Sequence, residues 1–462
     1  MLLSPTIQRL RQEFRPMLSL AWPVVMAELG WMAMGIVDTM MVGRVSAEAI
    51  GAVSIGSVLF FAVAIFGMGL LLGLDTLVSH AFGAGNLEEC HRSLLHGVYL
   101  NLILTPPLMA LIWLSIPWMD SWGIHPEVLR QTIPFLKALT WGLLPLLLYA
   151  SFRRYLQAMG LVKPVMFALI TANLVNVIGN WILIFGHLGA QAMGAEGSGW
   201  STCLARIYMA SSLLLYILYH DRRHKTGLLR IPLKLSLEHL QRLLRLGFPA
   251  ALQITLEVGV FAAATALVGR LNPASLAAHQ IVLNVASLTF MVPLGVASAG
   301  AVRVGQALGR RDPVAAGHTG WTALLLGTSF MLGAALTFLL FPKTILEIFT
   351  FEPTVISTGI SLLFVAAFFQ VFDGVQVVAT GVLRGAGDTR TPMICNLVGH
   401  WLLGLPVGYA LCFVWDLGVV GLWIGLSLGL IAVGAVLLGV WSRKVSSLKD
   451  KGKGTHTLVL GS

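Results

Sequence analysis

Residues 17–44 read MLSLAWPVVMAELGWMAMGIVDTMMVGR, an apolar run whose only charged residues before the closing Arg44 are Glu28 and Asp38. A membrane-spanning helix needs about 20 mainly apolar residues, and this run exceeds that length. The arginines that precede it resemble the start of a signal peptide, but the run is too long and has no small-x-small cleavage site. We therefore predict a first, retained membrane-spanning helix at 17–42.

The composition of the whole chain also favours a membrane protein. Of its 462 residues, 57% are hydrophobic and 11% are charged, and the mean hydropathy is +0.84. A soluble domain carries about 25% charged residues, so this chain has too few charges for a water-facing surface. The net charge of +10 does not indicate a nucleic-acid partner, because the basic residues fall in short loops between apolar runs.

Further apolar runs of similar length follow the first. The predicted spans are 17–42, 50–81, 94–117, 132–158, 164–186, 197–219, 243–268, 275–306, 317–341, 357–383, 393–415 and 418–442. The fold class is therefore predicted to be an all-α integral membrane protein with twelve transmembrane helices. The side that holds the termini and even-numbered loops carries 24 Lys and Arg residues against 5 on the other, which places both termini in the cytoplasm.

The first run recurs later in the chain. Residues 243–270 read LLRLGFPAALQITLEVGVFAAATALVGR, so Trp22-Pro23 and Phe248-Pro249 lie 226 residues apart, as do the two Val-Gly-Arg endings. The same offset relates Gly69 to Gly295. Repeats of six helices enter the membrane from the same side, so they are parallel and related by an axis along the membrane normal. We expect two lobes around a central cavity with alternating access; a static channel is the alternative.

The domain organisation follows from the repeat. It is a cytoplasmic amino-terminal segment, an N-lobe of helices 1–6, a basic cytoplasmic linker, a C-lobe of helices 7–12 and a cytoplasmic tail, at 1–16, 17–220, 221–242, 243–442 and 443–462.

Ionisable groups in the bilayer core are costly, roughly 2.5–3.5 kcal/mol each, and usually mark a site. Glu257 precedes Arg270 by 13 residues, which at 1.5 Å per residue places it about 19 Å deep. Asp373 also lies near mid-membrane, and helices 7–12 offer no basic residue at that depth. Since burial disfavours a lone charge, these acids can take up a proton or bind Na⁺; holding helices together through polar partners is the alternative.

A second candidate site lies in the N-lobe. Asp38 is in the outer half of helix 1, and Asn176 and Asn180 share one face of helix 5 because they are four residues apart. Carboxylate and amide oxygens suit a hard cation such as Na⁺, although such asparagines also form helix–helix hydrogen bonds. Glu28 and Asp75 are secondary candidates, and Arg206 inside the sixth helix is a candidate partner for one of these acids.

Motifs for enzymes and for ATP binding are absent from the sequence. It contains no G-x-x-x-x-G-K-[ST] phosphate loop, and no H-E-x-x-H or G-x-S-x-G in a credible context. We predict that the protein is not an enzyme, binds no ATP and no cofactor, and draws energy for transport from an ion gradient. A lipid-linked precursor flippase is the main rival, but its cavity would need basic residues for phosphate, whereas the interior charges here are mainly acidic.

Several segments resemble one family. They are Met34-Gly35-Ile36-Val37-Asp38-Thr39, Asn176…Asn180-Trp181, Gln253-Ile254-Thr255-Leu256-Glu257-Val258, Ala277-Ala278-His279-Gln280-Ile281, and Asp373-Gly374-Val375-Gln376-Val377-Val378 with Leu383-Arg384-Gly385. Together they resemble the multidrug and toxic compound extrusion (MATE) transporters, in particular the NorM branch, over essentially the whole chain.

The resemblance implies roles for particular residues. Glu257 and Asp373 match the C-lobe cation site of NorM-like proteins, and Asp38, Asn176 and Asn180 match the N-lobe cluster for Na⁺ or H⁺. The family exports cationic and amphipathic drugs in exchange for Na⁺ or H⁺, whereas Glu28 departs from its pattern. We therefore expect a monomeric antiporter in the cytoplasmic membrane, with small cationic substrates and membrane lipids as its partners. The sequence leaves the coupling ion open.

Overall fold

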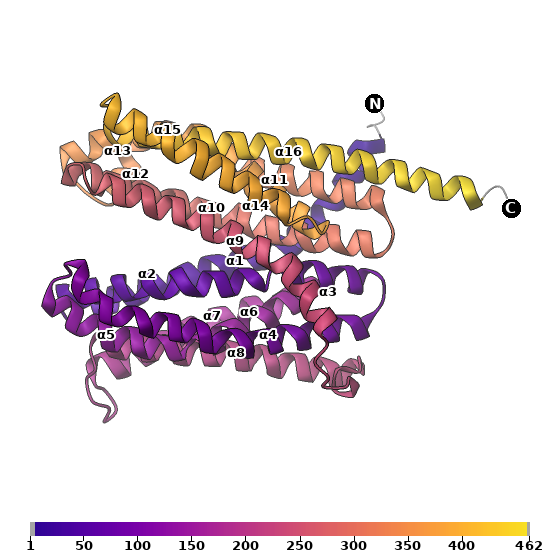
Figure 1. Ribbon diagram of the computed structural model, residues 1–462, viewed down its shortest axis with the longest axis horizontal. Helices are drawn as coiled ribbons and strands as arrows, with labels where there is room; N and C mark the ends of the chain where they lie inside the picture. Colours follow the sequence, from indigo (N-terminus) through magenta and orange to yellow (C-terminus); the bar gives the residue numbers. More distant parts are fainter. Residues whose placement is uncertain (1–4, 460–462) are drawn as a thin grey trace. The chain divides into compact units, whose positions relative to one another are not determined.

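The structure is a computed structural model that describes the backbone of residues 5–459 and the side chains of residues 13–448 (Figure 1). Within that part the chain is helical and contains no β-strand. Residues 1–4 of the predicted amino-terminal segment and residues 460–462 of the predicted tail lie outside the described residues. The tail as far as Val459 continues the last helix.

The helices of the described part match the predicted spans. In chain order they are α1 (Pro5–Val42), α2 (Ala47–Leu70), α3 (Gly73–Gly83), α4 (Leu87–Ser115), η1 (Ile116–Trp122), α5 (Pro126–Trp141), α6 (Leu143–Ala158), α7 (Val162–Phe185), α8 (Ala195–His224), η2 (Leu228–Arg230), α9 (Leu237–Val268), α10 (Pro273–Gly309), α11 (Pro313–Leu340), α12 (Pro342–Glu347), α13 (Pro353–Gly385), α14 (Arg390–Asn396), η3 (Leu397–Gly404), α15 (Leu405–Tyr409), η4 (Ala410–Val414) and α16 (Gly418–Val459). Eleven spans are long and apolar enough to cross a membrane, and α5 with α6, bent by 43°, gives a twelfth within the described residues. The prediction of twelve spans is confirmed.

Side-chain caps at the loops follow the same internal repeat. Ser46 and Asn86 accept hydrogen bonds from the backbone N–H groups three residues later, at the starts of α2 and α4. At the offset of 226 residues, Asn272 and Asp312 do the same at the starts of α10 and α11. These residue types are preferred at helix N-caps because their side chains satisfy otherwise unpaired N–H groups. The duplication therefore preserves where helices begin as well as their apolar runs.

The chain forms two compact units whose boundaries divide two helices. One unit contains Met26–Ala251, and the other contains Met1–Val25 together with Leu252–Ser462. Helix α1 therefore begins in the second unit and continues in the first, whereas α9 begins in the first and continues in the second. The two crossover points, after Val25 and Ala251, are again 226 residues apart. The first part of α1 and the first part of α9 are called the exchanged helix starts below, because each belongs to the unit that does not contain the rest of its helix. The predicted lobe boundaries, 17–220 and 243–442, do not include this arrangement.

Two glycines related by the repeat make room for the exchanged helix starts. A Cβ atom on Gly69 would lie 2.5 Å from the Cα of Ala251 in the first unit. A Cβ on Gly295 would lie 2.5 Å from Val25 Cγ2 and 2.9 Å from its backbone nitrogen in the second. Such approaches exclude any side chain at these positions. The repeated glycines are thus explained by backbone contact with α9 and α1, respectively.

Polar contacts fix the starts of the same two helices. In the second unit, Glu13 on α1 forms an ion pair with Arg303 and accepts a hydrogen bond of 3.3 Å from Thr319. In the first unit His239, at the repeat-related position on α9, lies 3.3 Å from Glu89. Each exchanged helix start is therefore in contact with its unit through a carboxylate and a basic side chain, Glu13 with Arg303 and Glu89 with His239.

We predict that Gly69→Ala and Gly295→Ala each lower the thermal stability of the purified protein. The added methyl group must displace backbone, and overpacking of this kind costs about 1–3 kcal/mol. Gly333→Ala in α11 is the matched control, because its Cβ would meet nothing within 4 Å. Melting temperatures measured in one detergent test this: equal values for all three variants and the wild type would contradict the packing role.

Candidate cation-coupling sites

The first unit brings Asp38 together with the two asparagines of α7. Asp38 on α1 is 8% exposed, and its Oδ1 accepts a hydrogen bond of 2.7 Å from Asn180 Nδ2. The same amide nitrogen lies 3.2 Å from Asn176 Oδ1, to which it also donates. Asn176 and Asn180 are fully buried. The three residues chosen from the sequence therefore form one continuous polar cluster.

Thr202 on α8 completes this cluster and was missed by the sequence analysis. Its hydroxyl donates to Asp38 Oδ2 at 2.9 Å, and the neighbouring Ser201 donates to the backbone carbonyl of Asn176 at 2.8 Å. Helices α1, α7 and α8 thus all contribute to the cluster. The available sequence signal was a threonine one helical turn before Arg206, but isolated hydroxyl residues are common in membrane helices.

The cluster is rich in oxygen atoms and offers neutral partners to the carboxylate. Asn180 Oδ1 is buried and accepts no hydrogen bond from the described residues, so it can serve as a further ligand. Hard cations prefer oxygen ligands from carboxylates, amides and hydroxyls. The arrangement therefore offers oxygen ligands to a small cation, or a carboxylate that can take up a proton, at Asp38.

The second unit contains the other predicted pair of acids. Glu257 on α9 accepts hydrogen bonds from Gln253 Nε2 at 2.8 Å and from Gln376 Nε2 at 3.2 Å. Gln376 on α13 also lies 3.5 Å from Asn396 Oδ1 on α14. The amides around Glu257 were not chosen from the sequence because neutral residues carry no pattern that singles them out.

Asp373 differs from Glu257 in its surroundings. Its side chain on α13 is 8% exposed, and it forms no hydrogen bond or ion pair with the residues that the structure describes. Asp373 and Glu257 interact electrostatically. Two like charges that interact in a low-dielectric environment are both destabilised unless a cation or a proton compensates them. The pair can therefore bind one positive charge.

The secondary candidates Glu28 and Asp75 have basic partners. Glu28 forms an ion pair with Arg153, and both side chains are largely buried. Asp75, also buried, lies 3.3 Å from Arg154. Both arginines belong to α6, and neither acid forms an ion pair with Arg206 among the described contacts. The charge of each acid is thus balanced within the protein.

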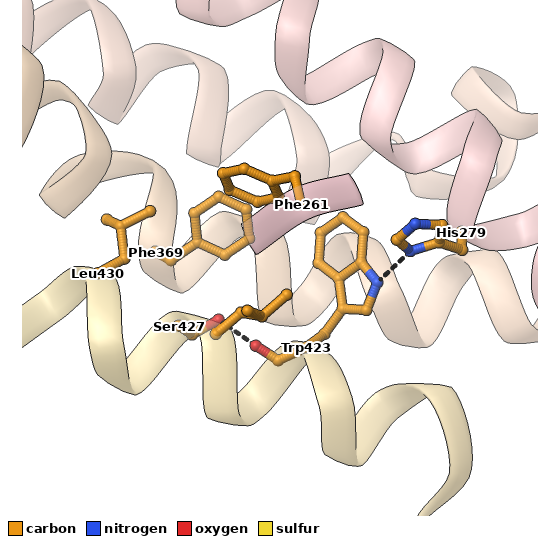
Figure 2. A pocket seen from close by; sticks show the side chains of 7 residues that line it. Phe261, His279, Phe369, Trp423, Ser427 and Leu430 are labelled. Carbon is orange, nitrogen blue, oxygen red and sulfur yellow. Dashed lines mark hydrogen bonds between the residues drawn. The ribbon is translucent and has the colours of Figure 1, made fainter. Parts of the chain in front are cut away.

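A pocket in the second unit is lined on one side by His279 and otherwise by Phe261, Phe369, Trp423, Leu426, Ser427 and Leu430 (Figure 2). Trp423 Nε1, which can only donate, lies 2.9 Å from His279 Nδ1. His279 therefore carries its proton on Nε2, which lies 2.9 Å from the Thr265 hydroxyl. Thr265 in turn donates to the Phe261 carbonyl at 2.9 Å. This chain links α9, α10 and α16, and it requires a neutral imidazole, so His279 has a structural role.

Comparisons with known proteins agree with this architecture. The chain matches the MatE family over residues 23–182 and 249–410, one segment in each repeat. NorM from Mesorhizobium japonicum is 36% identical over 94% of both chains, and the multidrug resistance protein NorM of Photobacterium profundum is 34% identical over 96% of this chain and 97% of its own.

The crystal structure of the eukaryotic MATE transporter AtDTX14 superposes with a TM-score of 0.84 at 23% identity, covering 96% of this chain and 99% of that one. An outward-facing multidrug resistance MATE transporter of the MOP superfamily gives 0.83 at 20% identity over 97% and 100%.

The fold therefore defines a membrane transporter of two repeated six-helix segments, and not an enzyme. The chain belongs to the MatE family.

We predict that Glu28→Gln destabilises the protein much more than Glu257→Gln does. Glu28→Gln leaves the buried guanidinium of Arg153 unbalanced, which costs about 3 kcal/mol or more. Glu257 has only amide partners among the described residues, and a glutamine keeps its size, so about 1 kcal/mol or less is expected. Denaturation of both purified variants tests this difference, and equal losses would contradict the division into paired and unpaired acids.

Proposed function

We propose that the protein is a secondary active efflux antiporter of the cytoplasmic membrane. It exports organic cations and amphipathic drugs in exchange for Na⁺ or H⁺, with both termini in the cytoplasm. The observation that carries this proposal is that Asp38, Glu257 and Asp373 lie inside the helical units with neutral hydrogen-bonding partners or none. A transported cation can supply the counter-charge that no ion pair with a described residue provides at these sites.

The contrast with the other acids supports this assignment. Glu13, Glu28 and Asp75 each meet an arginine, so their charges are satisfied without a ligand. Acids without such a partner in the membrane are costly and usually functional. Because Asp38, Glu257 and Asp373 are acids, the cargo that they favour is cationic, which speaks against a phosphate-bearing lipid precursor.

The names of the relatives agree with an export function. The relatives from Mesorhizobium japonicum and Photobacterium profundum carry multidrug resistance in their names. We transfer this activity to the present chain because each alignment covers at least 94% of both proteins.

The transport cycle follows from competition for charge. In the outward-facing state the carboxylates take up Na⁺ or H⁺, and loss of their negative charge weakens the binding of a cationic drug. The drug leaves, and the loaded protein returns to the inward-facing state, where it releases the ion and binds new drug. Exchange requires that drug and ion prefer opposite states, so that each lowers the affinity for the other. We expect a monomer in lipid to complete this cycle without a cofactor.

We predict that Glu257→Gln and Asp373→Asn each abolish drug resistance in cells while membrane expression stays intact. Both changes remove the negative charge and keep the side-chain size, so the cation has no counter-charge in the second unit. Growth of a drug-sensitive host on ethidium, together with immunoblots of the membrane fraction, measures the effect. Wild-type resistance in both variants would rule out this site.

For the first unit we predict that Asp38→Asn impairs export and that Thr202→Val reduces it several-fold. Valine has the shape of threonine but lacks the hydroxyl that donates to Asp38 Oδ2, so the carboxylate loses one of its fixed partners. Thr202→Ser is the matched control, because it keeps the hydroxyl and should export at close to the wild-type rate. Dye efflux from cells reports all three variants, and normal efflux by Asp38→Asn would eliminate the cluster as a coupling site.

A further inference from the structure

Arg206 lies one helical turn beyond the Asp38 cluster. It is on α8, four residues after Thr202, and is 2% exposed. Residues four apart on a helix share one face, with Cβ atoms about 5–6 Å apart. Because Thr202 touches the Asp38 carboxylate directly, Arg206 is held on the same side of α8, and its charge interacts with that of Asp38.

The guanidinium of Arg206 is buried without a matching set of acceptors. Its Nε and Nη1 atoms form no hydrogen bond with any described residue. Its central carbon lies instead 4.4 Å from the centroid of the Phe60 ring and 6.0 Å from that of Phe61, both on α2. Aromatic faces attract a cation, but they satisfy none of its N–H donors. A buried cation in this condition is expensive, so a structural role alone does not account for it.

The surrounding backbone provides a space for this side chain. A Cβ on Gly142 would lie 3.1 Å from Arg206 Nη1 and 3.2 Å from its Cδ. Gly142 is the break between α5 and α6, where the predicted fourth span bends by 43°. The guanidinium thus lies between the Phe60 ring and the break at Gly142.

We propose that Arg206 supplies a protein-bound positive charge close to Asp38. This charge lowers the affinity of the first unit for the coupling cation. The inference rests on the proposed antiport function. A fixed positive charge close to the carboxylate opposes an incoming cation and favours its release, because charges in partly desolvated sites interact strongly over several ångströms. Glu257 and Asp373 have no such base among the described residues. The two sites are therefore of unequal strength, with the weaker one at Asp38.

The test measures the concentration of coupling cation that gives half-maximal dye efflux from reconstituted vesicles. We expect Arg206→Gln to lower this concentration about tenfold, since the opposing charge is gone, whereas Arg206→Lys keeps the charge and stays within about twofold of wild type. Arg130→Gln is the charge-matched control and should change nothing, because Arg130 is exposed and pairs only with Glu127. An unchanged half-maximal concentration in Arg206→Gln, with only a lower maximal rate, would overturn the inference.

A second variant keeps the test decisive if Arg206→Gln does not fold. Phe60→Leu removes the ring on which the guanidinium rests and lets it approach Asp38, so the half-maximal concentration should rise about threefold; no change would overturn the inference.

The wild type is measured first. If its efflux responds to neither Na⁺ nor H⁺, the antiport proposal itself fails and the inference fails with it. If the wild type responds while both variants match it, the inference alone fails.

Discussion

An ionised carboxylate inside a bundle of membrane helices needs a positive charge nearby, and this requirement organises the polar interior of the protein. Removing a carboxylate from water is costly unless the charge is compensated. Glu13, Glu28 and Asp75 obtain compensation from arginines. Asp38, Glu257 and Asp373 form no ion pair with a described residue: Asp38 and Glu257 accept hydrogen bonds from amides or a hydroxyl, and Asp373 interacts with Glu257. Arg206 interacts electrostatically with Asp38 without pairing with it. We propose that a transported cation, which binds and is later released, compensates these carboxylates. The free-energy cost of burying them then couples ion binding to transport.

The internal repeat explains how the helices that carry these acids are held. Asp38 and Glu257 lie on α1 and α9, the two helices that each pass from one compact unit into the other. Glycines at positions 69 and 295 allow their backbones to approach closely, and acid–base contacts fix their starts. Along the chain, Asp38 and Glu257 therefore each follow the point at which their helix passes from one unit into the other.

Much of the fold could be predicted from the sequence because lipid imposes a simple rule. Twelve long apolar runs, the distribution of Lys and Arg, and the recurrence of 17–44 at 243–270 were sufficient for the helices and the repeat. The exchange of helix starts was not predictable, since apolar periodicity shows where a helix lies along the chain but not which neighbours it packs against. The longer reach of α16, to Val459, was not predicted, because past 442 the sequence becomes polar and no longer resembles a membrane span.

The candidate sites show the same limit. Acids and asparagines in apolar runs are conspicuous, so Asp38, Asn176, Asn180, Glu257 and Asp373 could be chosen from the sequence, and their roles in coupling stay predictions. Thr202, Gln253 and Gln376 are neutral and were not singled out, because such residues are common in membrane helices. Glu28 could not be classified, because the sequence does not show that Arg153, near the end of the predicted span 132–158, reaches it. Pairing between distant helices depends on packing, which a single sequence does not display.

The most direct test of the central claim is dye efflux from vesicles that contain the purified protein, with Na⁺ and H⁺ gradients imposed one at a time. We expect one of these gradients to accelerate ethidium export, and we expect the acceleration to disappear in a variant with Asp38→Asn and Glu257→Gln combined. Equal export rates in the wild type with either gradient present and with all gradients collapsed would contradict it.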